Sequence, residues 1–387
     1  MPDSARFEAL DAWRGICAIL IVVFHFISML PNSLSGMAFV RNAYLFVDFF
    51  FVLSGFVLCH SYRGQMRNAA DLWRFAVKRF GRVWPLHAAV LLAFVAAVLY
   101  INARPHPHEL ALTWDTTDYS ARALLPQLFL VNAMDMQGNS WNGPAWSIGA
   151  EFYTYLLFAL LLMFAARRLI VASAVLVVTA LAFILWKAPD LMNTTWDYGL
   201  VRCLAGFFAG VIAYHVYERR RQQRLLRMTM REAATVIFVV GFVVWAGEGP
   251  DSVGKLSLAA PLVFGIAVVV FAEEGGLLSV LLRLPPLQAL GRYSYSIYMV
   301  HQPLLVMLCY GIWANGYTTK AFGPARAWSG SSTIVLADFV LAVLLIAAAC
   351  CHLIEGPARA RFARLSGRVR ENSIGRRSGG VARARSI

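Results

Sequence analysis

Hydrophobic residues occur along this chain in long runs, which short polar or basic segments separate. Because an α-helix rises about 1.5 Å per residue, about 20 apolar residues cross the ~30 Å hydrocarbon core of a bilayer. The pattern therefore predicts an all-α integral membrane protein with about ten transmembrane helices. The predicted spans are residues 10–30, 43–60, 84–101, 148–166, 169–186, 201–217, 233–247, 257–272, 294–313 and 333–354.

Composition and charge agree with this class of protein. Hydrophobic residues make up 59% and charged residues 14% of the chain, which argues against a soluble protein. The net charge of +14 is concentrated in loops and in the C-terminal tail, where the positive-inside rule accounts for it without a nucleic-acid partner. Ten spans with both termini in the cytoplasm place the basic segments 61–83, 218–232 and 355–387 on the inner side. We expect a multi-pass protein of the bacterial cytoplasmic (inner) membrane.

Two regions are expected, a membrane domain over residues 1–355 and an Arg-rich, disordered cytoplasmic tail over residues 356–387. The N-terminus lacks the features of a cleaved signal peptide, so we expect the first helix to be retained. The outer segment 102–147 is long and aromatic, which suits either a carbohydrate or the membrane interface. Its His106-Pro-His108 has no further ligand nearby, and we expect no metal.

The first span carries two ionisable residues, Arg14 and His25. Such residues are costly in hydrocarbon and therefore indicate a functional site. They are separated by about three helical turns, so they share one face and lie about 16 Å apart along the axis. One helix thus presents a cation and an imidazole at two depths of the membrane.

Two carboxylates are expected near the depth of His25. Asp48 lies just inside the second span, and Glu151 lies one turn into the fourth, whose first turn Ser147 can cap. In the functional interpretation, a carboxylate fixes the tautomer of His25, which then acts as a general base. In the alternative, the histidine and the carboxylate only satisfy each other's hydrogen bonds or that of a backbone carbonyl. Ser54, in Ser54-Gly55, is either a nucleophile or part of a small-residue packing surface.

Arg79 and Arg82 precede the third span and share a face if the segment is helical. Planar guanidinium groups suit phosphate recognition, although arginines at a cytoplasmic membrane end can also be topology markers alone. In the ninth span Ser294, Tyr298 and His301 form a polar stripe, which lines a passage or binds a neighbouring helix.

These motifs together resemble the acyltransferase family 3 of integral-membrane acyltransferases. The resemblance rests on Arg14 to His25, on Val47-Asp-Phe-Phe-Phe-Val-Leu-Ser-Gly-Phe56, on Arg79 to Arg82 before Trp84-Pro85, on Trp146-Ser147 with Glu151, and on Gly291 to His301. It covers nearly the whole chain. The C-terminal esterase-like domain of some relatives is expected to be absent.

The resemblance implies an acyl-CoA-dependent O-acyltransferase, with acetyl-CoA or another acyl-CoA as co-substrate and no permanently bound cofactor. The group, usually acetyl, would move to a hydroxyl of an extracytoplasmic carbohydrate or glycoside, such as lipopolysaccharide or exopolysaccharide. By the resemblance, His25 is the essential histidine, Arg14 is its paired basic residue, and Arg79 and Arg82 form the motif of the acyl-donor side. Our physical interpretation adds that Asp48 or Glu151 orients the catalytic His25 and that Arg14 also binds the donor. It further expects these residues to line the path or stabilise an oxyanion: Ser54, Trp146, Ser147, Ser294, Tyr298 and His301. The alternative is a polytopic transporter with an intramembrane proton relay.

Overall fold

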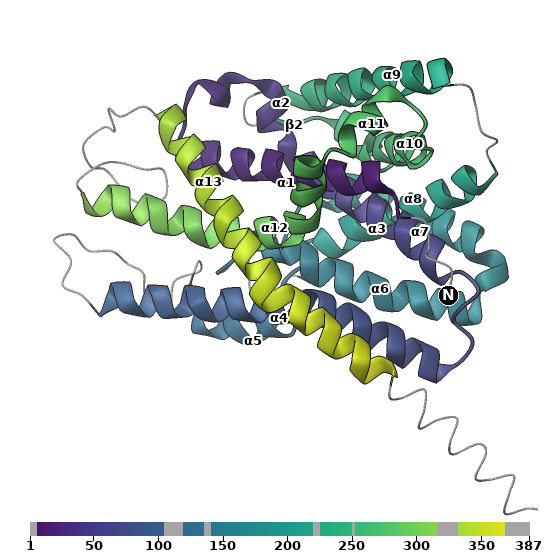
Figure 1. Ribbon diagram of the computed structural model, residues 1–387, viewed down its shortest axis with the longest axis horizontal. Coiled ribbons are helices and arrows are strands. Elements are labelled where there is room, and N and C mark those ends of the chain that lie inside the picture. Colours follow the sequence, from purple (N-terminus) through teal and green to yellow (C-terminus); the bar gives the residue numbers. More distant parts are fainter. Residues whose placement is uncertain are drawn as a thin grey trace, which may run out of the picture.

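The computed structural model describes residues 6–103, 119–134, 141–219, 225–249, 252–315 and 332–367. Within these ranges the protein is almost entirely helical, and ten helical segments are long and apolar enough to cross a membrane, which confirms the predicted number of spans. The main helices run roughly side by side, and α13 crosses them obliquely (Figure 1). The helices are α1 (Glu8–Met29), α2 (Ala38–Arg41), α3 (Phe46–Tyr62), α4 (Ala69–Asn102), α5 (Leu124–Leu128), α6 (Trp146–Phe164), α7 (Leu169–Lys187), α8 (Gly199–Glu218), α9 (Leu225–Trp245), α10 (Ala260–Ala272), α11 (Leu277–Leu282), α12 (Pro285–Ala314) and α13 (Ser332–Cys350).

A two-stranded antiparallel hairpin, β1 (Gly247–Gly249) with β2 (Ser252–Val253), connects α9 to the segment before α10. Figure 1 shows the start of α1 and the end of the last helix toward the same end of the helix array, which agrees with an even number of spans. The assignment of this side to the cytoplasm stays a prediction.

Two helices extend further than their apolar runs suggested. The third span is part of α4, which begins at Ala69 and is 34 residues long, so Arg79 and Arg82 lie within a continuous helix. The last helix continues through a π-helical turn, Cys351–Glu355, and remains helical to Gly367. Residues 356–367 are therefore ordered, contrary to the expected disordered tail, and residues 368–387 lie outside the described ranges. His106, His108 and most of the outer segment also lie outside them.

Glycines allow two pairs of helices to pack at very short distance. Gly15 of α1 faces the backbone of Leu290 and Gly291 in α12, and Gly291 faces the carbonyl of Asp11. In a second pair, Gly55 of α3 faces the carbonyl of Phe207 in α8. A side chain at any of these glycines would overlap backbone atoms, as expected where small residues drive helix association in membranes. The prediction that Ser54-Gly55 belongs to a small-residue packing surface is thus confirmed for Gly55.

The parallel pair α1 and α12 forms the centre of the site. Contacts between the two helices run from Gly15 and Gly291, each about two turns into its helix, to His25 and His301 further along. Since both helices are held at the glycine contact, the polar residues of one are aligned with those of the other. The polar stripe of α12 consequently faces α1 and α6.

Candidate active site

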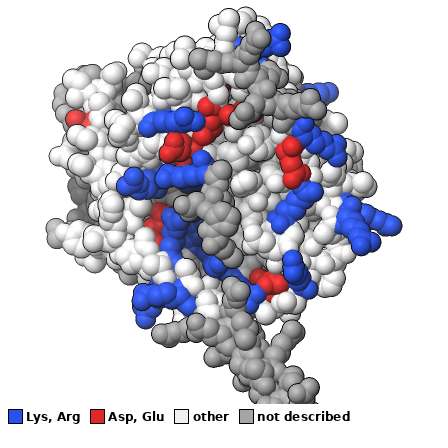
Figure 2. Space-filling model, turned by 45° about the vertical axis from the view of Figure 1, so that its right-hand side comes forward, with Lys and Arg blue, Asp and Glu red and all other residues white. Residues whose placement is uncertain are grey.

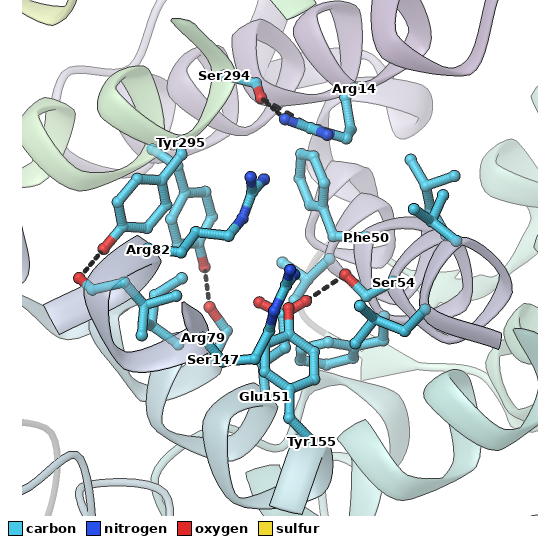
Figure 3. A pocket seen from close by; sticks show the side chains of 18 of the residues that line it. Arg14, Phe50, Ser54, Arg79, Arg82, Ser147, Glu151, Tyr155, Ser294 and Tyr295 are labelled. Atoms are coloured by element: carbon cyan, nitrogen blue, oxygen red, sulfur yellow. Dashed lines mark hydrogen bonds between the residues drawn. The ribbon is translucent and has the colours of Figure 1, made fainter. Parts of the chain in front are cut away.

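A cavity of about 250 Å³ lies between α1, α3, α4, α6 and α12 (Figure 3). Three arginines line it, Arg14 from α1 and Arg79 and Arg82 from α4. Aromatic and aliphatic side chains cover much of the remaining wall, among them Phe50, Val57 and Tyr295. We call this space the arginine cavity. It brings together the three residues that the sequence placed on the donor side.

Arg14 is held in place by α12. Its Nε and Nη2 atoms donate to the Ser294 hydroxyl at 3.2 and 3.1 Å, and Nη2 also reaches the Gly291 carbonyl at 3.4 Å. A further contact of 3.3 Å joins Nη1 to Asp11 on the same helix. Ser294, which the sequence assigned to a path lining, thus positions the guanidinium at the wall of the cavity (Figure 3).

The two arginines of α4 differ in their surroundings. Arg79 donates to the Tyr62 hydroxyl at 3.4 Å, and its guanidinium lies 5.6 Å from the Tyr62 ring and 5.8 Å from the Phe75 ring. The Arg79 Nε atom is buried without a hydrogen-bond partner. Arg82 extends into the cavity in Figure 3 and makes no hydrogen bond to any residue that the structure describes. Buried guanidinium donors without partners are suited to an anionic ligand.

Glu151 supplies the one carboxylate among the residues that line the arginine cavity. It accepts a hydrogen bond from Ser54 of α3 (Figure 3). The sequence placed Glu151 beside His25, but the structure places it with Arg14, Arg79 and Arg82, because it projects from α6 toward α3 and α4. We expect it to balance part of their charge when no anion is bound.

A second, smaller cavity of about 120 Å³ contains His25. Its wall also includes Tyr44, Trp146, Arg202 and Gln302. Val47 and Tyr298 line both cavities, so these two side chains lie where the cavities adjoin. We call this second space the histidine cavity. The arginines and the histidine thus occupy two adjacent compartments.

Tyr298 is fixed by residues at the start of α6. The Ser147 hydroxyl donates to the Tyr298 hydroxyl at 2.9 Å, and Tyr298 donates to the Pro144 carbonyl at 3.1 Å. The expected cap by Ser147 is wrong, because α6 begins at Trp146 and has no side-chain cap. The Ser147 hydroxyl instead positions Tyr298, which lines both cavities.

His25 contacts a second histidine rather than a carboxylate. Its Nδ1 lies 3.1 Å from the Ile21 carbonyl and 3.1 Å from Nε2 of His301. Nδ1 of His301 lies 3.3 Å from the Ile297 carbonyl, to which it can only donate. A neutral His301 therefore accepts at Nε2, and His25 carries its proton on Nδ1. This tautomer leaves Nε2 of His25 as the basic nitrogen.

Asp48 does not orient His25, contrary to the sequence-based expectation. Both of its carboxylate oxygens bind Arg202 of α8, at 3.1 Å to Nε and 2.8 Å to Nη2, and both side chains are almost fully buried. Arg202 also donates to the carbonyls of Thr194 and Tyr44. Because both carboxylate oxygens of Asp48 are engaged in this bidentate pair, Asp48 is not the hydrogen-bond partner of the His25 imidazole.

Arg202 is the site residue that the sequence interpretation missed. It is a lone arginine inside an apolar run, the same signal that identified Arg14. Its guanidinium lies 5.4 Å from the Trp146 ring, and Gly199 lies directly against the same ring. Arg202 thus lines the histidine cavity, and its ion pair with Asp48 holds it there.

Two polar atoms in the residues that line the histidine cavity are buried without a hydrogen-bond partner, the Tyr44 hydroxyl and the Gln302 side-chain oxygen. Buried polar groups are normally hydrogen-bonded, so these two atoms are available to the polar groups of a ligand. Among the described residues, no group of three or more His, Cys, Asp or Glu side chains is arranged to hold a metal ion. The cavity is suited to a neutral, hydroxyl-bearing ligand.

The fold and these cavities define a polytopic membrane protein with a polar site buried among its helices. A family model described as an acyltransferase domain, acyltransferase 3, matches residues 7–354. The chain belongs to this family of membrane acyltransferases. Membership favours acyl transfer over the alternative of a proton-coupled transporter.

Three curated relatives are similar to the chain. Acyltransferase MdmB of Streptomyces mycarofaciens is 28% identical over 95% of both chains. Protein 2 in the picA locus of Rhizobium radiobacter is 32% identical over 40% of this chain and 81% of its own. O-acetyltransferase OatA of Staphylococcus aureus is 22% identical over 79% of this chain and 52% of its own. No solved structure matches the chain.

Proposed function

We propose that this membrane O-acyltransferase moves an acyl group, acetyl in the first instance, from a cytoplasmic acyl-CoA to a hydroxyl of an extracytoplasmic carbohydrate or glycoside. The observation that carries the proposal is the pair of adjoining cavities. One contains three arginines and the other contains a histidine with a free basic nitrogen. The protein acts in the bacterial cytoplasmic membrane, with the arginine cavity facing inward.

The arginine cavity receives the acyl-CoA. Its guanidinium groups attract the phosphates, and the positive-inside rule places the basic ends of α3 and α4 in the cytoplasm, where acyl-CoA is made. The pantetheine arm spans roughly 15–20 Å when extended, which is a large part of a ~30 Å hydrocarbon core. The thioester can therefore reach the boundary at Val47 and Tyr298 while the phosphates stay near Arg79.

His25 acts as the general base. Nε2 removes the proton of the acceptor hydroxyl, and the oxygen attacks the thioester carbonyl to give a tetrahedral oxyanion. Collapse of this intermediate breaks the carbon–sulfur bond, and the CoA thiolate takes the proton from His25 as it leaves. Tyr298 is placed to donate to the oxyanion in place of the Pro144 carbonyl, with Ser147 donating to Tyr298 in turn.

The histidine cavity receives the acceptor. Its volume of about 120 Å³ admits one edge of a sugar rather than a whole oligosaccharide. The Tyr44 hydroxyl and the Gln302 oxygen, which have no partner, are available to neighbouring hydroxyls of that sugar. The Trp146 ring adds an aromatic surface of the kind that sugar rings contact. Asp48 acts here by holding Arg202 rather than by proton transfer.

Acetyl transfer by purified protein in nanodiscs tests the proposal. Radiolabelled acetyl-CoA is supplied with and without a panel of glycoside acceptors, and wild type is compared with His25→Ala. We expect wild type to hydrolyse or transfer the acetyl group and the variant to lose at least about 100-fold in rate. Equal activity in the two proteins would remove His25 from the mechanism, and no reaction of wild type with acetyl-CoA would refute acetyl-CoA as the donor.

The same preparation separates direct transfer from an acyl-histidine relay. Wild type is mixed with labelled acetyl-CoA alone, and the protein is quenched and examined for covalent label. Direct transfer predicts unlabelled protein together with a normal rate once acceptor is added. Label that is present in wild type and absent from His25→Ala would establish the relay.

A further inference from the structure

A groove with a volume of about 670 Å³ lies on the face that carries the proposed cytoplasmic ends of the helices. It is bounded by the connection from α3 to α4, by the first turns of α4, and by the end of the last helix at Ala363, Ser366 and Gly367. The start of α4 and the end of the last helix lie side by side in Figure 1, and Phe362 packs against Phe80 and Gly81. The helical extension beyond residue 355 thus closes one side of the groove.

Basic side chains dominate the groove. Arg67, Arg74 and Lys78 line it with a single carboxylate, Asp71, which is already bound by Arg74 and by the backbone N–H of Arg67. The side chains of Arg67 and Lys78 make no hydrogen bond or ion pair to any described residue, and both residues are exposed. Lys and Arg side chains are numerous on this face in Figure 2. The groove therefore presents two uncommitted cations, Arg67 just before the first turn of α4 and Lys78 at the tenth residue of this helix.

The groove adjoins the arginine cavity. Tyr62 and Phe75 line the groove, and the Arg79 guanidinium lies over both rings while the same residue lines the cavity. On α4, Arg74, Lys78 and Arg82 follow one another at intervals of four residues, so a strip of cations rises about 12 Å from the groove to the cavity. An elongated ligand with phosphates at its outer end can occupy both spaces.

We infer that this groove binds the phosphorylated adenosine end of the acyl-CoA, with Arg67 and Lys78 contacting its phosphate groups. The inference rests on the proposed function, because it concerns the outer part of the same donor. The groove, at about 670 Å³, offers more room for adenosine bisphosphate than the arginine cavity, at about 250 Å³, and it adds two cations without a described partner. Arg79 then lies at the junction where the pantetheine arm leaves the nucleotide.

Direct binding tests the inference. The probes are CoA, adenosine 3′,5′-bisphosphate and pantetheine, and the protein is held in nanodiscs of neutral phosphatidylcholine. Wild type is compared with the double variant Arg67→Gln/Lys78→Gln and with Arg219→Gln, an exposed arginine at the end of α8 that does not line the groove. We expect the double variant to bind CoA and the bisphosphate about tenfold more weakly, with pantetheine binding unchanged. Arg219→Gln should match wild type.

The outcomes separate this inference from the proposed function. Equal affinities of wild type and double variant for the bisphosphate would overturn the groove assignment, as would an equal loss of pantetheine binding. If the expected binding pattern is found but no acetyl transfer occurs, the groove stands and the proposed reaction falls. If wild type binds no bisphosphate yet is retained on phosphatidylglycerol vesicles better than the double variant, the groove holds lipid head groups and the inference is overturned.

Discussion

His301 Nε2 lies 3.1 Å from Nδ1 of His25, and together with the Ile21 carbonyl, at the same distance from Nδ1, it places the proton of His25 on that nitrogen. The two residues come from α1 and α12, which are far apart in the sequence and parallel in space. His301 is in turn oriented by the Ile297 carbonyl of its own helix. The pair thus resembles the usual arrangement of an oriented base, with an imidazole in the position that a carboxylate often takes.

Removal of His301 should slow the reaction without preventing folding. His301→Ala removes one of the two acceptors that contact His25 Nδ1–H and leaves the Ile21 carbonyl as the other. Because the imidazole is then held less firmly, we expect kcat to fall about tenfold, the lower end of the loss when a partner of a metal-ligating histidine is removed. His301→Gln keeps an acceptor for Nδ1–H and should recover part of the loss. His215→Ala is the matched control, because His215 is buried and its Nδ1 likewise contacts the carbonyl four residues earlier. A full wild-type kcat in His301→Ala would contradict this role.

Asp48 should prove to be structural. Asp48→Asn leaves Arg202 as a buried cation with only one neutral side-chain partner, and loss of one member of a buried pair costs about 3–5 kcal/mol. We expect a lower midpoint of thermal unfolding in detergent. The double variant Asp48→Asn/Arg202→Gln removes both charges and should regain part of the stability. An inactive Asp48→Asn protein with wild-type thermal stability would instead support the catalytic role first assigned to Asp48.

The glycine contact between α1 and α12 should be required for activity. Gly291→Ala places a methyl group against the Asp11 carbonyl, so the helices must separate and His301 must move from His25. We expect lower stability and lower kcat. Gly311→Ala, on the same helix, meets nothing within 4 Å and should be neutral or slightly stabilising. Similar thermal melts and rates for the two variants would show that this close approach is unimportant.

Tyr44→Phe should weaken use of the acceptor alone. The substitution removes one hydroxyl that has no hydrogen-bond partner, so the fold should keep its stability. A lost hydrogen bond to the acceptor should raise its KM about three- to tenfold. Acetyl-CoA hydrolysis without acceptor is the internal control and should not change. Loss of hydrolysis and transfer in equal measure would place Tyr44 outside the acceptor site.

Arg14→Gln should weaken use of the donor. The guanidinium lines the arginine cavity, and a lost charged hydrogen bond should raise the KM for acetyl-CoA about tenfold or more. Arg292→Gln changes an exposed arginine only two residues from Ser294 and should leave the KM unchanged. If the two variants have the same KM, Arg14 does not contact the donor.

The sequence by itself determined the class of protein and singled out most residues of the candidate site. In a run of about 20 apolar residues that crosses a bilayer, a helix satisfies every backbone hydrogen bond within the segment, so the ten spans followed from hydropathy. Arg14, His25 and the Arg79–Arg82 motif were found because ionisable residues in apolar or membrane-end positions are costly to keep. These signals are local, and a single sequence contains them.

Only the tertiary structure decided which polar residues are partners. Depth alone suggested that Asp48 and Glu151 meet His25, but depth does not give the direction in which a helix face points. The rotation of α3 turns Asp48 to Arg202 of α8, and the glycine contact of α1 with α12 brings His301 to His25. Because side-chain partners in a membrane are chosen by helix order and rotation, the two cavities became visible only once the helices were packed.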